Sequence, residues 1–105
     1  MPKEAPPTIA SEALAWTQEA MAAGRYVVDP HVRKRMAQRA VEWRSLWYGV
    51  KNATACLPYT PDNGDRMGGT SWRILGPDHE GEEITLGVET FVDHLGRRVL
   101  LLTVF

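Results

Sequence analysis

Residues 31–39 carry five basic side chains in nine positions, and three of these are spaced for one face of a helix. At about 100° of rotation per residue, His31, Arg35 and Arg39 fall within about 80° of one another. The apolar residues of the same stretch fall on a separate stripe, which we expect to be buried. The three basic residues therefore lie at the border between core and solvent, where the edge of a cleft would be.

An imidazole beside two guanidinium groups suits the cleavage of RNA by its own 2′-hydroxyl. The planar guanidinium of an arginine can hold a phosphate through two parallel hydrogen bonds. His31 would take the proton from the attacking hydroxyl, while Arg35 and Arg39 would stabilise the charge that builds on the phosphate. The spacing also allows a structural alternative, in which His31 caps or packs locally and the arginines pair with an acidic loop at 78–83.

Arg73 is a further candidate for phosphate binding. It lies in a strand-like run, in which Trp72 and Ile74 share one face and Arg73 occupies the other. From that face it could meet the cleft of the basic helix. The alternative is an ordinary cross-strand ion pair with Glu89.

Three segments have the signals of helices. Residues 11–24 are rich in alanine and run from Ser11, a residue type common at N-caps, to Gly24, typical of a helix end. Asp29 followed by Pro30 marks a second helix start, which we expect to continue to about residues 38–40. Its buried stripe would be Val32, Met36 and Ala40, and the third helix would bury Trp43, Leu46, Trp47 and Val50.

Three strand-like runs follow a turn-rich stretch at 57–69. They cover residues 70–75, 83–92 and 98–105, and the last is apolar on both faces, as expected of a covered strand. Residues 25–29 are too short for more than a first strand or a linker. Two to three N-terminal helices packed on a C-terminal antiparallel β-meander make an α+β domain.

The composition is that of one small globular domain. The chain has 105 residues and a net charge of −1, which argues against a protein that coats nucleic acid. The charge is uneven: residues 24–51 hold seven Lys and Arg against two acids (+5), and residues 52–96 hold two against eight (−6). One basic half can bind a polyanion locally, although solvated helix faces and hairpin loops would give the same distribution.

Several classes of protein do not fit the sequence. The single Cys56 allows no intramolecular disulfide, and we expect a buried or half-buried thiol. No apolar run approaches the roughly 20 residues that span a bilayer, and no signal peptide is recognisable, so we expect a cytoplasmic protein without membrane contact. The three histidines are scattered, and we expect neither a metal site nor a cofactor.

The pattern His31-x3-Arg35-Met36-x2-Arg39, followed by an amphipathic helix and a meander ending in Leu-Leu-Thr-Val-Phe, resembles the RelE/ParE toxin superfamily. It is most similar to a branch of unknown function whose helix carries H-x3-RM-x2-R. The resemblance covers roughly residues 26–105. It implies a RelE/ParE-like α+β domain at 24–105, preceded by a flexible leader (residues 1–8) and an added helix within residues 1–23.

The resemblance also implies a function. Many members are toxin endoribonucleases that need no metal, so His31, Arg35 and Arg39 would be catalytic and Thr103 would bind substrate. Thr103 also fits an ordinary β-branched strand residue. The implied partners are RNA, free or as ribosome-bound mRNA, and a cognate antitoxin. The aromatic residue that ends the pattern is Phe105, which offers no hydroxyl.

Two other functions remain open on the sequence. Some members of the superfamily inhibit gyrase, so the chain could be a non-catalytic module that binds or inhibits a protein target. It could also be an accessory protein in which the basic motif merely orders the helix pair.

Overall fold

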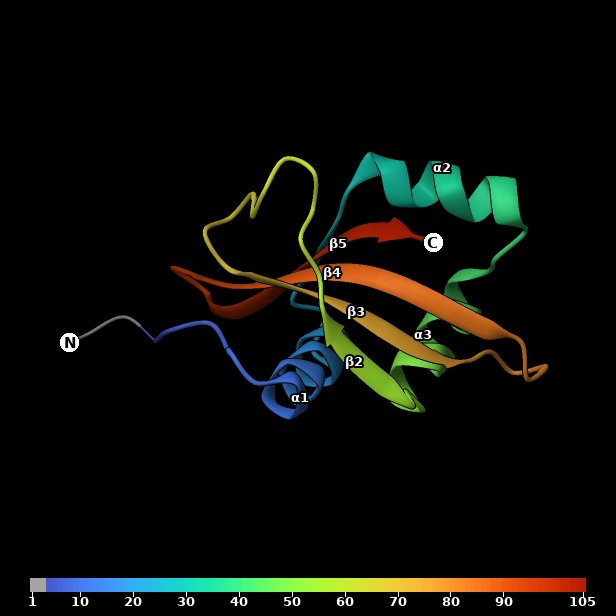
Figure 1. The fold of residues 1–105 in the computed structure, drawn as a ribbon, viewed down its shortest axis with the longest axis horizontal. Coiled ribbons are helices and arrows are strands. Elements are labelled where there is room, and N and C mark those ends of the chain that lie inside the picture. Colours follow the sequence, from blue (N-terminus) through green and yellow to red (C-terminus); the bar gives the residue numbers. More distant parts are fainter. Residues whose placement is uncertain (1–3) are drawn as a thin grey trace.

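The computed structural model describes residues 4–105, which form three helices and five strands (Figure 1). In chain order the elements are α1 (Ala10–Ala22), β1 (Tyr26–Val28), α2 (Pro30–Arg39), α3 (Trp43–Lys51), β2 (Ala55–Pro58), β3 (Thr70–Pro77), β4 (Glu83–Asp93) and β5 (Gly96–Val104). The α+β class is confirmed. None of the helices in this described part of the chain is long and apolar enough to cross a membrane.

The five strands form one mixed sheet in the order β1-β5-β4-β3-β2. Strands β3, β4 and β5 make the predicted antiparallel meander, and β2 pairs antiparallel with β3. The prediction of a purely antiparallel sheet is wrong, because β1 pairs parallel with β5 and places Val27 opposite Leu100. Since β1 and β2 have only three and four residues, neither is long enough to show an alternating pattern.

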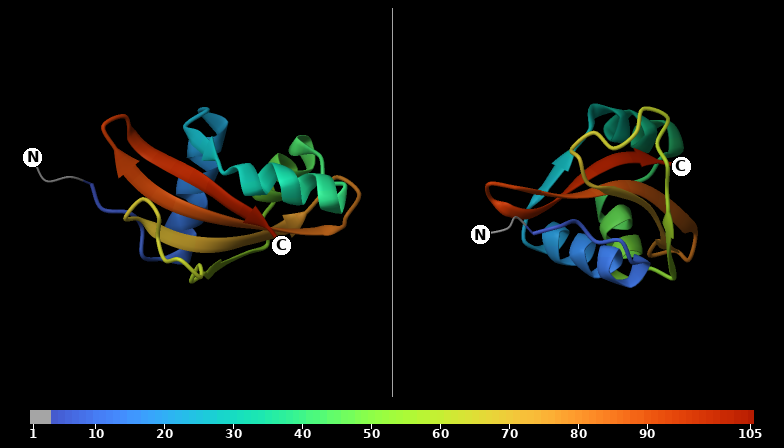
Figure 2. Two further views of the ribbon diagram at one scale, coloured as in Figure 1. Left: turned by 90° about the horizontal axis from the view of Figure 1, so that it is seen from above. Right: turned by 60° about the vertical axis from the view of Figure 1, so that its left-hand side comes forward.

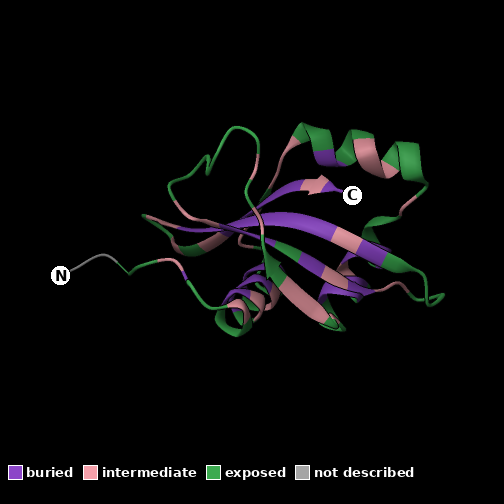
Figure 3. Cartoon of the chain, viewed as in Figure 1, coloured by how far each residue is buried: buried purple, intermediate pink, exposed green. Residues whose placement is uncertain are grey.

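Helices α1 and α3 cover one face of the sheet, and α2 lies beside β5, where Val32 joins the same main core (Figures 1 and 2). Buried residues concentrate on the long strands and on the sheet-facing sides of α1 and α3 (Figure 3). In β5, Val99 and Leu101 belong to the main core, whereas Leu100 and Leu102 pack with Phe91 in a second cluster. The prediction that this strand is covered on both faces is therefore confirmed.

The helix predictions hold in position but not in every detail. Gly24 follows α1 with a φ of +72°, as expected of the residue that ends a helix. The predicted N-cap Ser11 is wrong, because α1 begins one residue earlier and Ile9 occupies the cap position. In α3, Leu46 is buried, but Trp43 is 37% exposed, because this first residue of the helix stacks on Tyr26 at the edge of the sheet.

Two glycines allow α3 to approach β3 closely. A Cβ on Gly76 would lie 2.0 Å from the carbonyl oxygen of Gly49, a distance that no side chain can occupy. A Cβ on Gly49 would be 3.6 Å from its nearest neighbours, which is ordinary contact. Gly76 is therefore the residue that permits this packing.

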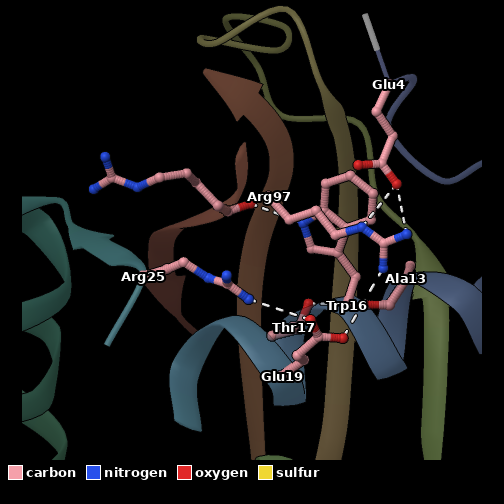
Figure 4. Close-up of polar contacts among 8 residues, drawn as sticks. Glu4, Ala13, Trp16, Thr17, Glu19, Arg25 and Arg97 are labelled. Atoms are coloured by element: carbon pink, nitrogen blue, oxygen red, sulfur yellow. Dashed lines mark hydrogen bonds and ion pairs between the residues drawn. The ribbon is translucent and has the colours of Figure 1, made fainter. Parts of the chain in front are cut away.

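The segment before α1 is fastened to the sheet through Arg97 (Figure 4). The Arg97 guanidinium lies 4.7 Å from the centre of the Trp16 ring and forms ion pairs with Glu4 and Glu19, at 2.5 and 4.0 Å. Further along, Thr70 Oγ1 donates a hydrogen bond to the carbonyl of Pro7. These contacts involve the described part of the predicted leader; its residues 1–3 lie outside the described residues.

Candidate functional site

An open cleft of about 290 Å³ brings together three parts of the chain that are distant in sequence. Its walls come from α2, from the end of β5 and from the connection between β2 and β3, which we call the 59–69 loop. This loop arches over the sheet on the side of α2 (Figures 1 and 2). The polar side chains that line the cleft are His31, Arg35, Tyr59, Asp62, Asn63, Arg66 and Thr103.

Asp29 sets the start of α2 and its connection to the loop. Its Oδ1 accepts a hydrogen bond from the backbone N–H of His31 at 2.7 Å, so the predicted N-cap is confirmed. Its Oδ2 accepts a charged hydrogen bond from the guanidinium of Arg66. These contacts, with Arg66 the larger cause, hold the pKa of Asp29 below its usual value. One carboxylate therefore places both His31 and Arg66 at the cleft.

Arg35 is held by the strand beside it. Its Nε donates a hydrogen bond to the carbonyl oxygen of Val104 at 3.2 Å. This bond uses one edge of the guanidinium, and the two terminal nitrogens remain for a ligand. Val32, on the neighbouring face of α2, is completely buried and Met36 is half-buried, as predicted. The predicted burial of Ala40 is wrong, because the helix ends there and Ala40 is exposed.

The fully buried carboxylate of Glu89 anchors the 59–69 loop. It accepts hydrogen bonds from the backbone N–H groups of Arg66, Met67 and Gly69, at 2.6, 2.7 and 2.9 Å. Bonds of this kind to a charged acceptor in a dry environment are strong. They fix the wall of the cleft that carries Arg66.

An aromatic pair forms the remaining wall. The rings of Tyr59 and Phe105 meet edge to face with centroids 5.3 Å apart, and the Arg73 guanidinium lies 5.0 and 4.2 Å from their centres. Both rings sit above Gly87, where a Cβ would come within 3.4 Å of Tyr59 Cε2 and 3.2 Å of Phe105 Cε2. The absence of a side chain at Gly87 leaves room for the pair.

The structure brings together some of the residues predicted from sequence and separates others. His31, Arg35 and Thr103 line the same cleft, and Arg73 stacks on the aromatic wall without lining it. Arg39 lies instead at a neighbouring cleft of about 360 Å³ with the acidic residues of the β3–β4 turn, Asp78, Glu80, Glu82 and Glu83. Arg39 thus lies beside the acidic loop with which the structural alternative pairs it.

Sequence reasoning missed three residues of this site, Tyr59, Arg66 and Glu89. The first two lie in a stretch that was assigned only turn signals. The alternative of a cross-strand ion pair between Arg73 and Glu89 is wrong. Glu89 lies opposite Ser71 in the sheet, and its carboxylate accepts hydrogen bonds from the loop amides. A carboxylate within the otherwise uncharged run 84–92 was the available signal, since a buried charge requires partners.

The described residues contain no cluster of three or more His, Cys, Asp or Glu side chains placed to hold a metal ion. Cys56 is half-buried, and burial raises the pKa of its thiol to about 11. No family model matches the chain, and no curated protein or solved structure does so either.

Proposed function

We propose that the chain is an endoribonuclease toxin of the RelE/ParE type, which cleaves RNA in the cytoplasm without a metal ion. The observation that carries this proposal is the meeting of His31, Arg35 and Arg66 in one cleft. An imidazole and two guanidinium groups are the functional groups that attack by a 2′-hydroxyl on a phosphate requires. The aromatic wall beside them suits a flexible single strand, whose bases can stack.

In the proposed reaction His31 takes the proton of the 2′-hydroxyl as the oxygen attacks the phosphorus. Arg35 and Arg66 bind the non-bridging oxygens, and the Thr103 hydroxyl is available as a further donor to them. Arg39 and Arg73 lie beyond the walls of the cleft. We assign Arg73 to a phosphate next to the reacting one, and Arg39, beside the acidic β3–β4 turn, to no phosphate.

A cognate antitoxin is the proposed protein partner. The basic half of the chain, residues 24–51, includes α2, and most of that helix is exposed. An acidic partner that covers α2 would block His31 and Arg35 together.

The first test uses the purified chain, a fluorescent single-stranded RNA and an excess of chelator. We expect cleavage to a 2′,3′-cyclic phosphate and a 5′-hydroxyl. His31→Ala should reduce the rate by about 10²–10⁴-fold, and Arg35→Ala by about 10²–10³-fold. Matched controls are His94→Ala, in an exposed turn, and Arg33→Ala, on the same helix but away from the cleft. Intact RNA with the wild-type chain would refute the proposal.

A second function is favoured by a different surface. A pocket of about 430 Å³, larger than the His31 cleft, is lined by Tyr26, Val28, Arg33, Met36 and Trp43. A mostly apolar pocket with a partly exposed tryptophan suits an anchor side chain of a protein target. On this alternative the chain is a non-catalytic module that inhibits or scaffolds a protein.

Expression in bacteria separates the two functions. If the chain is a nuclease, wild type should arrest growth with loss of transcripts, and His31→Ala should relieve the arrest while Trp43→Ala leaves the nuclease active. If the chain binds a protein target instead, wild type should arrest growth while the RNA stays intact. Trp43→Ala should then relieve the arrest, and His31→Ala should not.

A further inference from the structure

The proposed cleavage needs a second proton transfer. As the 2′-oxygen bonds to phosphorus, the bond from phosphorus to the 5′-oxygen breaks, and this oxygen leaves as a strongly basic alkoxide unless it is protonated. His31 is occupied with the proton of the 2′-hydroxyl at that moment. Efficient cleavage therefore calls for a separate proton donor within the same cleft.

We propose that the hydroxyl of Tyr59 gives its proton to the departing 5′-oxygen. This inference rests on the proposed nuclease function and adds a catalytic residue to it. Phe105, which lines the same cleft, carries no hydroxyl. The fold places a tyrosine from the 59–69 loop directly against Phe105 instead.

The other polar groups of the cleft are poor donors. Arginine does not lose its proton in proteins, which excludes Arg35 and Arg66. Asp62 bears a carboxylate, which accepts hydrogen bonds when ionised. The Thr103 hydroxyl is an alcohol, about as weak an acid as the leaving alcohol itself. Among the described residues that line the cleft, a phenol is the group that holds a proton in neutral solution and can release it to an alkoxide.

The Tyr59 ring is held in place on several sides. Its backbone N–H donates to the carbonyl of Ser71 at 3.1 Å, its ring meets Phe105 edge to face, and Arg73 lies over its face. A Cβ on Gly87 would be 3.4 Å from Tyr59 Cε2 and 3.1 Å from Thr103 Cγ2. Tyr59 and Thr103 therefore both flank the open position at Gly87, and both line the cleft.

The atoms of the step balance without a further reagent. The 2′-oxygen–phosphorus bond forms and the phosphorus–5′-oxygen bond breaks, which leaves a 2′,3′-cyclic phosphate. The 2′-hydroxyl proton moves to His31, and the Tyr59 proton moves to the 5′-oxygen, which leaves as a 5′-hydroxyl. Exchange with water then returns a proton to the phenolate and removes one from the imidazolium.

The test compares two substrates that differ in one atom. Each is a DNA strand with a single ribonucleotide, so that only one linkage has a neighbouring 2′-hydroxyl, and a mixture of the four bases is used at that position. In one strand the leaving atom is the 5′-oxygen, and in the other it is sulfur. A thiolate leaves without protonation, so the sulfur substrate does not need the proton donor.

We expect Tyr59→Phe to slow cleavage of the oxygen substrate by about 10²–10⁴-fold and to leave cleavage of the sulfur substrate close to that of wild type. His31→Ala should slow both. Tyr48→Phe, at an exposed position of α3, is the matched control. Binding of an all-deoxy strand, which cannot be cleaved, should be unchanged in Tyr59→Phe, because the ring and its stacking remain.

Two results would overturn the assignment while leaving the nuclease function intact. Full activity of Tyr59→Phe on the oxygen substrate would show that another group donates the proton. An equal loss on both substrates would show that Tyr59 acts in positioning. If wild type cleaves neither strand nor ordinary RNA, the nuclease function itself fails, and the role of Tyr59 fails with it.

Discussion

The buried carboxylate of Glu89 gives the most direct test of how the cleft is held together. Its two oxygens accept three backbone hydrogen bonds from the 59–69 loop, at 2.6, 2.7 and 2.9 Å. Glu89→Gln keeps the size of the side chain and changes one oxygen to an NH₂ group. The substitution therefore removes acceptor capacity and charge but creates no cavity.

The expected cost follows from the individual bonds. Glu89 Oε2 accepts from Met67 and Gly69, so the single oxygen of glutamine can keep those two bonds. The N–H of Arg66, whose bond to Glu89 is partly buried, then faces an NH₂ group, and a shielded donor without a partner costs about 1–3 kcal/mol. Loss of charge assistance removes about 1 kcal/mol from each remaining bond. The total of about 4 kcal/mol corresponds to a fall in Tm of about 15–30 °C.

Urea unfolding followed by tryptophan fluorescence measures the change in the free energy of unfolding. Hydrogen exchange of the Arg66, Met67 and Gly69 amides reports on the loop itself, because local detachment exposes them even where global unfolding does not occur. Glu83→Gln, exposed at the start of the same strand, is the matched control. A free energy of unfolding within about 0.5 kcal/mol of wild type, with the three amides still protected, would refute this account of the loop.

Three further predictions concern the fold and its ionisable groups. Gly76→Ala should destabilise the domain by about 2–4 kcal/mol or prevent folding, whereas Gly49→Ala, on the other side of the same contact, should be neutral or stabilising by up to about 1 kcal/mol; similar unfolding midpoints for the two would contradict the close approach of α3 and β3. Because the pKa of Asp29 is lowered in the folded chain, its contribution to stability is present above about pH 4 and is lost as the pH falls through its folded pKa. Urea unfolding at pH 7 and pH 3 should therefore show Asp29→Asn destabilised at pH 7 and less so at pH 3; an equal deficit at both would mean that the charge contributes nothing. With a thiol pKa of about 11 against an ordinary value of 9.0, Cys56 should react with iodoacetamide near pH 7.5 about 100-fold more slowly than a free thiol, and a rate like that of a small thiol would show that it is not shielded.

The helices and long strands could be predicted because each carries a complete local pattern. Asp29 and Pro30 suffice to start α2, since one accepts a backbone N–H and the other needs none. The apolar positions of β4 and β5 repeat often enough to show which faces are covered. The shared cleft position of His31 and Arg35 follows in the same way from helical spacing.

The features that could not be predicted from the sequence depend on contacts between distant residues. Strand β1 is recognisable only through its pairing with β5, some 70 positions later in the chain. Tyr59 and Arg66 belong to a loop without periodicity, and their positions depend on Glu89 and Asp29. Arg39 shares a helical face with Arg35, yet the β3–β4 turn approaches its end of the helix, so spacing alone could not assign the two arginines to different clefts.

The long range of these contacts also determines when the cleft can exist. His31 and Arg35 come early in the chain, the 59–69 loop comes in its middle, and the Thr103 and Phe105 walls come at the end of β5. During synthesis the first two parts leave the ribosome before β5, in which residues 99–101 pair with β1 and the residues that follow close the cleft. Under the proposed function, a nascent chain therefore cannot cleave RNA until β5 has left the exit tunnel and has folded into the sheet.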